Sequence, residues 1–261
     1  MASILKSLFA NRQPLPADDF DKTIVNIPSP YQLRDLCPVM RDAPDSNEEN
    51  LGRQQQFKIR LAHSDASRSA ATMLVQQRYA WRGYKAGEIK KQPNRITLVA
   101  YLADQIVGSL NIGYDSPEGL SADERYKEEM DALRAQGLNV GEITKLAIDE
   151  NAGSKQVLAG MINIAYLYGL IHGITDAVIE VTPRHKPFYQ RMLDFRQIGD
   201  ERFYAASNTN VVLMHIKLAH IGERIEAVGG KGSGTGDRSI YPYFFDPNDQ
   251  QGIMQRLKGG S

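Results

Sequence analysis

The sequence has little that would suggest a disulfide-bonded, zinc-binding, nucleic-acid-binding or membrane-spanning protein. Its 261 residues include one cysteine, Cys37, which excludes an internal disulfide, and no cluster of cysteine and histidine suggests a zinc site. Lys and Arg together number 31, as do Asp and Glu, so no net charge attracts nucleic acid or anionic membranes. No apolar run approaches the ~20 residues of a membrane span. We therefore expect a cytoplasmic protein with no metal, nucleic-acid partner or membrane span.

The composition divides the chain into a central domain and two flanking segments. Residues 1–56 are rich in Pro, Asp, Asn and Gln with little periodicity, which predicts an irregular arm lying along the domain. Residues 57–218 form the predicted domain, since a chain with 42% hydrophobic residues can bury a core. Residues 219–261 are a C-terminal extension that contains a Gly-rich linker over 229–236. The apolar residues 240–245 are predicted to dock on the domain or on a second subunit.

Hydrophobic periodicity in the domain predicts an α/β fold with a mixed central sheet and helices on both faces. Alternating or continuous apolar runs mark the strands, and apolar residues at helical spacing between capping signals mark the helices. The predicted strands are 57–61, 96–102, 106–114, 141–149, 176–181 and 211–216, and the main predicted helices begin at Ser64, at the capping box 121–124 and at Ser154. The strands 96–102 and 106–114 are expected to form a hairpin.

The segment after the strand 176–181 carries the most specific motif. The chain passes through Pro183 into a short helix that contains Phe188 and Tyr189 and ends at Phe195. This strand, proline and aromatic helix resemble the last βα unit of the GNAT acyltransferases, in which the tyrosine often serves as a proton donor. The alternative is that these aromatic side chains are only the packed face of an amphipathic helix.

Three motifs together resemble the long-chain N-acyl amino acid synthases, which are related to the acyl-homoserine-lactone synthases. The motifs are the segments 115–126, 142–147 and 179–193, and the resemblance covers roughly residues 57–218. It implies a GNAT fold, an acyl carrier protein as donor and an amino acid as acceptor. The donor substrate would be acyl-phosphopantetheine on the carrier, with no bound cofactor. Because the family includes N-acyl-tyrosine synthases, tyrosine is a candidate acceptor.

Glu142 is the predicted general base and Tyr189 the predicted acid. Acyl transfer to an amine needs a base for the ammonium group and an acid for the departing thiolate. Glu142 lies in an apolar strand, where burial would raise its pKa toward the working range. The alternative is a structural ion pair between Glu142 and a neighbouring Arg or Lys.

Further residues are predicted to contact substrate. The Glu-x-Ser-Arg stretch of the acyl-homoserine-lactone synthases falls on Glu142, Thr144 and Lys145, and the lysine lacks the planar fork of arginine. In a regular strand Lys145 would face away from Glu142 unless a bulge reverses the alternation. Arg184 and His185 could bind a substrate carboxylate or only cap the helix. Trp81, in an aromatic corner, is the last predicted contact.

The turn after the strand 141–149 is the predicted donor site. CoA-dependent GNAT enzymes have several glycines in this turn to wrap a pyrophosphate, but this chain has one, Gly153. With Ser154 and Lys155 it could hold the single phosphate of a phosphopantetheine arm, or Gly153 and Ser154 could be an ordinary helix cap. An acidic carrier protein would also need a local basic patch. The predicted patch is Lys155 with Lys90, Lys91 and Arg95.

The helix 154–172 is apolar around most of its circumference, which is more than one core face requires. We therefore predict that part of it lines an acyl tunnel. The predicted tunnel residues are Val157, Leu158, Met161, Ile162, Ala165, Leu167 and Tyr168.

Two other functions remain open from the sequence. One is a CoA-dependent GNAT N-acetyltransferase, against which the single glycine of the donor turn argues. The other is a catalytically silent GNAT-like module that binds an acyl ligand or a carrier protein. The oligomeric state is not fixed by the sequence.

Overall fold

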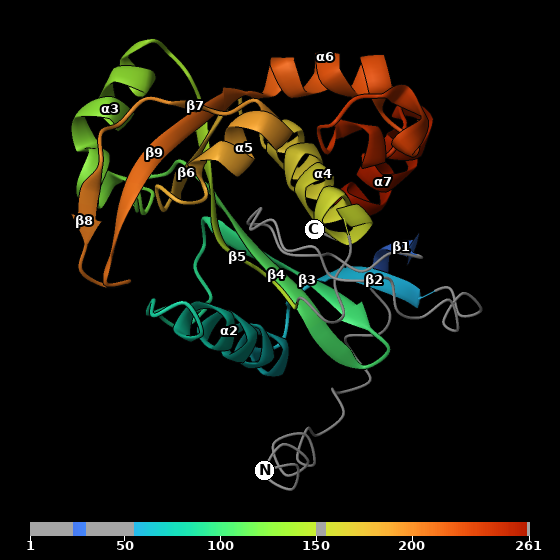
Figure 1. Ribbon diagram of the computed structural model, residues 1–261, viewed down its shortest axis with the longest axis horizontal. Coiled ribbons are helices and arrows are strands. Elements are labelled where there is room, and N and C mark those ends of the chain that lie inside the picture. The colour runs from blue at the N-terminus through green and yellow to red at the C-terminus, as the bar shows by residue number, and fades with distance from the viewer. Residues whose placement is uncertain (1–22, 30–54, 150–154, 260–261) are drawn as a thin grey trace, which may run out of the picture.

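A computed structural model describes residues 23–29, 55–149 and 155–259, and a mixed β-sheet runs through it (Figure 1). Neighbouring strands are antiparallel, except that β5 and β6 are parallel. Over the described residues the strand order is β1-β2-β3-β4-β5-β6-β9-β7, with β8 paired to β9. The strands are β1 Thr23–Ser29, β2 Gln55–Leu61, β3 Arg95–Leu102, β4 Gln105–Tyr114, β5 Val140–Ile148, β6 Asp176–Val181, β7 Arg196–Gln197, β8 Arg202–Tyr204 and β9 Thr209–Lys217.

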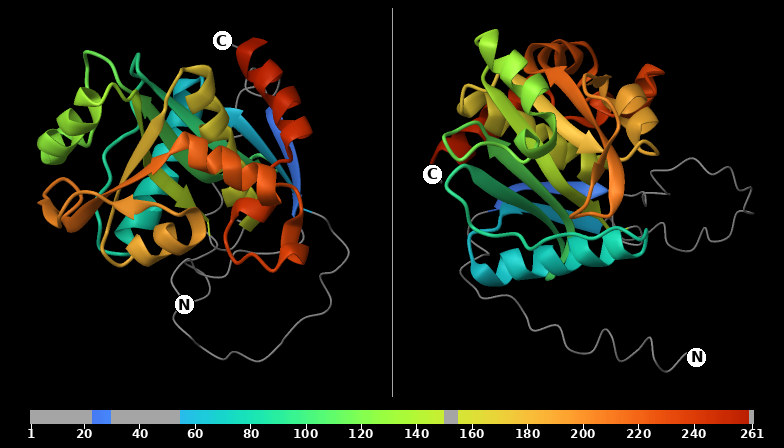
Figure 2. Two further views of the ribbon diagram at one scale, coloured as in Figure 1. Left: turned by 90° about the horizontal axis from the view of Figure 1, so that it is seen from above. Right: turned by 90° about the vertical axis from the view of Figure 1, so that its left-hand side faces the viewer.

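Helices cover both faces of the sheet, so the α/β prediction is confirmed. Figure 2 shows α2 on one face, where Ala71 and Val75 pack against Val99 and Ala147. On the other face α4 packs against the strands, and among the described residues no helix is long and apolar enough to cross a membrane. The helices are α2 Asp65–Ala80, α3 Asp123–Ala135, α4 Lys155–Ile171, α5 Lys186–Leu193, α6 Leu218–Val228 and α7 Pro247–Gly259, with the 3-10 turns η3 Gly232–Thr235 and η4 Tyr241–Tyr243.

The strand β5 contains the bulge that the sequence left as an alternative. Thr144 pairs with Asn111 and Ala147 pairs with Ser109, so one residue of β4 lies opposite two residues of β5. Lys145, at this point, has a φ of 52°, in the left-handed region. The parallel pairing with β6 ends at the pair Ile143 and Ile179. The second half of β5 therefore diverges from β6, and this divergence opens the sheet.

The N-terminal segment is more regular than predicted where the structure describes it. Residues 23–29, predicted as part of an irregular arm, form β1 on β2, and Ile24 and Ile27 are buried. The β-branched run Thr23-Ile24-Val25 suits a strand, although the composition around it suggests irregular structure. The rest of the predicted arm before β2, including Cys37, lies outside the described residues.

The C-terminal extension packs on the domain of the same chain. Tyr241 and Phe244 are fully buried against α4, and the backbone N–H of Phe245 donates to Asn163 Oδ1 of α4 at 2.8 Å. Arg256 Nε of α7 donates to the Ile24 carbonyl oxygen of β1 at 2.9 Å, and Figure 2 shows α7 beside β1. The predicted linker contains the 3-10 turn η3. The extension thus completes the core over α4.

Candidate active site

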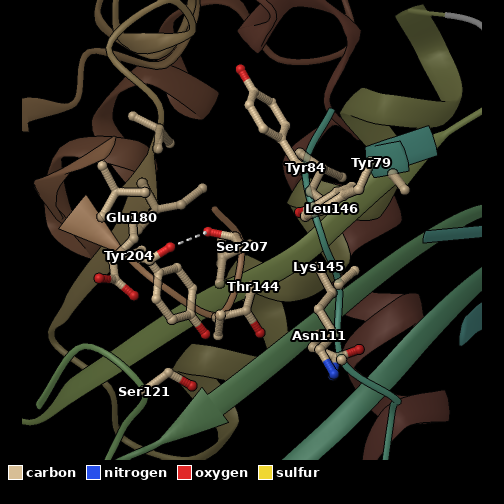
Figure 3. A pocket seen from close by; sticks show the side chains of 18 of the residues that line it. Tyr79, Tyr84, Asn111, Ser121, Thr144, Lys145, Leu146, Glu180, Tyr204 and Ser207 are labelled. Atoms are coloured by element: carbon tan, nitrogen blue, oxygen red, sulfur yellow. Dashed lines mark hydrogen bonds between the residues drawn. The ribbon is translucent and has the colours of Figure 1, made fainter. Parts of the chain in front are cut away.

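A pocket of about 570 Å³ lies on the α2 face of the sheet, where β5 and β6 diverge. Its walls come from the end of α2, the segment 84–95, the second half of β5, the ends of β6 and β8, and the start of α5. Figure 3 shows Glu180, Tyr204 and Ser121 on one side of this pocket and Lys145 and Asn111 on the other, with Thr144 between them. The pocket has the size and mixed lining of a small-molecule site.

Two rows of side chains cross β3, β4 and β5 on this face. In the first row Arg95 pairs with Gly113, and Gly113 pairs with Glu142. A Cβ atom on Gly113 would lie 3.0 Å from both Arg95 Nη1 and Glu142 Cγ, so the glycine leaves the space in which these two side chains meet. In the second row Thr97, Asn111 and Thr144 lie side by side.

The contacts of Glu142 are those expected of a structural ion pair, which was the alternative to a general base. Its side chain is 2% exposed and forms a salt bridge with Arg95. Its carboxylate also accepts hydrogen bonds from the backbone N–H of Ser121 at 2.9 Å and of Ala122 at 3.1 Å. Glu142 does not line the large pocket. The structure therefore favours the ion pair over the predicted base.

Tyr189, the predicted acid, lies in the wall of the pocket. Its ring packs edge-on against Phe188 and Phe195, with centroids 5.2 Å and 6.0 Å away. Burial, and then the nearby Tyr79, raise the pKa of the Tyr189 phenol well above its usual value. The phenol is therefore protonated at neutral pH and is a weaker acid than an exposed tyrosine. The ring also packs against the core, so Tyr189 has the structural role that was the alternative and is in place for the proposed catalytic role as well.

His185 lines the pocket and is held from two sides. Its Nε2 lies 3.0 Å from Arg82 Nη1 and its Nδ1 lies 2.9 Å from Thr182 Oγ1. Because a guanidinium can only donate, Nε2 is the acceptor and Nδ1 carries the proton. His185 occupies the N-cap position of α5, but its side chain makes no capping hydrogen bond.

Of the other predicted substrate contacts, Thr144 and Lys145 line the pocket, whereas Arg184 and Trp81 do not. Lys145 Nζ donates to the Glu88 carbonyl oxygen, and burial, followed by the nearby charge of Arg95, lowers the pKa of Lys145. Arg184 is exposed just before α5. Trp81 is 67% exposed at the end of α2, where Arg78 and Arg82 lie over its ring. These two side chains are therefore directed to solvent.

The predicted acyl-tunnel helix α4 is mostly core. Ile162 and Ala165 line a second, apolar cavity of about 40 Å³, on the far side of the sheet. Ile143, Leu146, Ile179 and Tyr189 border both this cavity and the large pocket. Predicted tunnel residues that line neither cavity are Val157, Leu158, Met161, Leu167 and Tyr168, all buried in the core. They are apolar because the sheet covers one side of α4 and the C-terminal extension the other.

The predicted donor residues that the structure describes lie on different elements. Gly153 and Ser154 lie outside the described residues. Lys155, at the start of α4, has its Nζ 4.3 Å from the centre of the Tyr243 ring, and burial is the main cause that lowers its pKa. In the predicted patch, Lys90 and Lys91 are exposed, and Lys90 borders the pocket. Arg95 turns inward to the pocket instead of joining this patch.

A second buried ion pair, which was not predicted, joins Glu180 in the pocket wall to Arg125 behind it. Glu180 of β6 accepts two hydrogen bonds of 2.6 Å from Arg125 of α3, and the Arg125 guanidinium lies 3.6 Å from the centre of the Tyr204 ring. Burial is the main cause that raises the pKa of Glu180. A lone glutamate within an apolar strand was the available signal, as it was for Glu142.

Comparisons with known proteins place the chain in a family. The protein-family model described as N-acyl amino acid synthase FeeM matches residues 70–217, which is more than half of the chain. The structure of FeeM, an N-acyl amino acid synthase from uncultured soil microbes, is similar with a TM-score of 0.60 and 24% identity, covering 64% of this chain and 94% of that chain.

Two further solved structures share less with the chain. The acyl-homoserine-lactone synthase LasI has a TM-score of 0.44 and 13% identity, over 63% of this chain and 91% of that chain. A GNAT-family acetyltransferase from Streptococcus pneumoniae has a TM-score of 0.43 and 16% identity, over 62% of this chain and 99% of that chain. A search among curated proteins finds no match. On the family match, the chain belongs to the FeeM family of N-acyl amino acid synthases and is an acyltransferase that acts on an amine.

Proposed function

We propose that the enzyme transfers a long-chain fatty acyl group from the phosphopantetheine arm of an acyl carrier protein to the α-amine of an amino acid, in the cytoplasm. The observation that carries this proposal is the opening between β5 and β6. Ile143, Leu146, Ile179 and Tyr189 line both the pocket of about 570 Å³ and the apolar cavity beside α4, so apolar side chains extend from one to the other. An acetyl group would not need such an apolar extension.

The bulge in β5 supports the position of the thioester in this proposal. A bulge leaves a residue without its ladder partner, and the pairing of β5 with β6 has ended by Ile143. Backbone N–H groups near Lys145 can therefore donate to the oxygen that becomes negative when the amine attacks the carbonyl carbon. The C–N bond forms, the C–S bond breaks, and the departing thiolate takes a proton from Tyr189, while the attacking nitrogen loses a proton as it becomes the amide and so restores the Tyr189 phenol. The ammonium of the acceptor first loses its proton to pocket water, since Glu142 does not line the pocket.

The proposal is tested by product analysis. Purified enzyme is incubated with palmitoyl acyl carrier protein and a mixture of the common amino acids, and N-acyl amino acids are detected by mass spectrometry. The same analysis of lipids from cells that express the chain identifies the natural acyl length. Absence of N-acyl amino acids in both experiments would refute the proposal.

If an acyl carrier protein is the donor, cations near the pocket and at the start of α4 are expected to contribute to its binding. Lys90→Glu and Lys155→Glu are each expected to raise the KM for acyl carrier protein roughly threefold to tenfold, because each reverses a charge facing an acidic partner. The KM should also become less sensitive to salt. Lys258→Glu, on an exposed position of α7, is the control. If acyl-CoA serves equally well and both variants behave as wild type, the donor is CoA and the carrier assignment fails.

The acyl-chain assignment predicts a change of chain length at Ala165. Ala165 is 6% exposed and lines the cavity behind the opening. Ala165→Phe is expected to fill this cavity and shorten the preferred acyl chain by several carbons, whereas Ala165→Gly should leave long chains accepted. The measurement is competition among acyl carrier proteins loaded with chains of different length. An unchanged preference in folded Ala165→Phe enzyme would place the acyl chain elsewhere.

A further inference from the structure

The guanidinium of Arg95 is held in place but keeps donors for a ligand. Its side chain is 12% exposed, lines the pocket, and crosses over Gly113 to form the salt bridge with Glu142. This bond uses Nη1. Among the described residues no hydrogen bond is made to Nε or Nη2. A buried arginine oriented by a carboxylate on one nitrogen can still bind a second anion through its other nitrogens.

The other arginines in or next to the pocket wall contact groups of the protein, and Arg78, which lines the pocket, lies over the Trp81 ring. Arg125 directs its guanidinium to Glu180, Glu124 and the Ser121 carbonyl oxygen. Arg82 contacts His185, and Lys145 donates to Glu88. Lys85 and Lys90 are exposed at the rim. Arg95 is therefore the buried cation of this wall best able to bind a carboxylate.

Two further features of the pocket wall next to Arg95 bear on what binds there. Burial and then the charge of Arg95 lower the pKa of Lys145, so the two cations lie close enough to repel each other. Asn111, in the neighbouring row, is 5% exposed, and its Oδ1 is buried with no hydrogen-bond partner among the described residues. Because Asn111 lines the pocket, this oxygen can accept a hydrogen bond from a donor group of a ligand.

We propose that Arg95 binds the α-carboxylate of the acceptor amino acid, that Asn111 Oδ1 accepts a hydrogen bond from the amine of the same amino acid, and that Glu142 positions Arg95. This inference rests on the proposed function, because it assumes an amino acid as acceptor. Asn111 lies two residues from Gly113 along β4, or about 7 Å, and is paired with Thr144. An amino acid anchored here points its amine along the second row toward Thr144. Thr144 precedes the bulge at which the thioester carbonyl is placed.

The test compares two acceptor substrates that differ only in whether they carry this carboxylate. The acceptor amino acid that wild-type enzyme acylates is compared with its carboxamide. Arg95→Lys keeps the positive charge next to Glu142 but loses the fork. It is expected to raise the KM for the amino acid about tenfold to a hundredfold, with kcat within roughly threefold. The KM for the carboxamide should stay within a factor of about two, so the preference for the free acid is lost.

Arg191→Lys, an exposed arginine of α5, is the matched control and should keep both KM values. If Arg95→Lys is poorly folded, the double variant Arg95→Gln/Glu142→Gln replaces both charges by amides and should show the same loss of preference. An unchanged preference in either folded variant overturns the assignment of Arg95. If wild-type enzyme acylates no amino acid, the proposed function itself fails, and this result is distinct from a wild-type enzyme whose preference does not depend on Arg95.

Discussion

Replacing Glu142 by alanine is expected to lower the free energy of unfolding by about 3–5 kcal/mol, as for a broken buried ion pair. The variant would leave the Arg95 guanidinium without its partner and would remove the acceptor of the Ser121 and Ala122 N–H groups. Urea unfolding followed by circular dichroism measures the change. A loss below about 1 kcal/mol, the range of an exposed pair, would show that the pair is not buried as described.

The variant Glu142→Gln separates the ion pair from a catalytic base. Loss of a general base lowers turnover on the order of a hundredfold or more. We expect instead that turnover of Glu142→Gln rises with pH between about pH 6 and pH 9 as in wild type, because the acceptor amine loses its proton to water. The KM for the acceptor should increase, since Arg95 is less firmly held. A hundredfold loss of turnover together with an altered pH profile would restore Glu142 as the base.

Replacing Tyr241 by alanine is expected to destabilise the protein by about 3–5 kcal/mol, the usual range for removing a buried aromatic side chain. Tyr241 is fully buried, packs on Phe244 with ring centroids 5.1 Å apart, and donates its hydroxyl hydrogen to the Leu193 carbonyl oxygen at 2.8 Å. This bond ties the C-terminal extension to the end of α5. The helix that carries Tyr189 should therefore loosen.

Tyr241→Phe is the matched control for this prediction. It removes only the hydroxyl group, so a loss of about 0.5–1.5 kcal/mol is expected. Denaturant unfolding of both variants gives the comparison. If Tyr241→Ala unfolds at the same denaturant concentration as wild type, the extension contributes little to the stability of the core.

The central elements could be predicted because their hydrophobic patterns are local. The strand expected over 141–149 is Val140–Ile148, and the helix expected over 154–172 is Lys155–Ile171. The strand β1 was missed because its short β-branched run lies within a stretch of sequence rich in Pro, Asp, Asn and Gln. Its pairing with β2 depends on residues about thirty positions away.

The candidate site could be predicted only in part, because register across strands is not visible in a single sequence. Glu142, Thr144 and Lys145 were identified from one strand, yet the function of Glu142 depends on Arg95, which lies across Gly113. Arg95 was grouped with Lys90 and Lys91 because they are close in sequence. The strand β3 instead turns it into the pocket.

The bond from Arg256 to Ile24 has a consequence for biosynthesis. It joins residues 232 positions apart, and the α7 and η4 segments that cover α4 are translated long after α4 itself. During translation the apolar side chains of α4 therefore remain exposed and can contact other protein chains, as in proteins that fold through partly exposed intermediates. The core closes only after the segment around Arg256 has left the ribosome. Nascent chains of this enzyme should consequently be most prone to aggregation before residues 240–259 have been made.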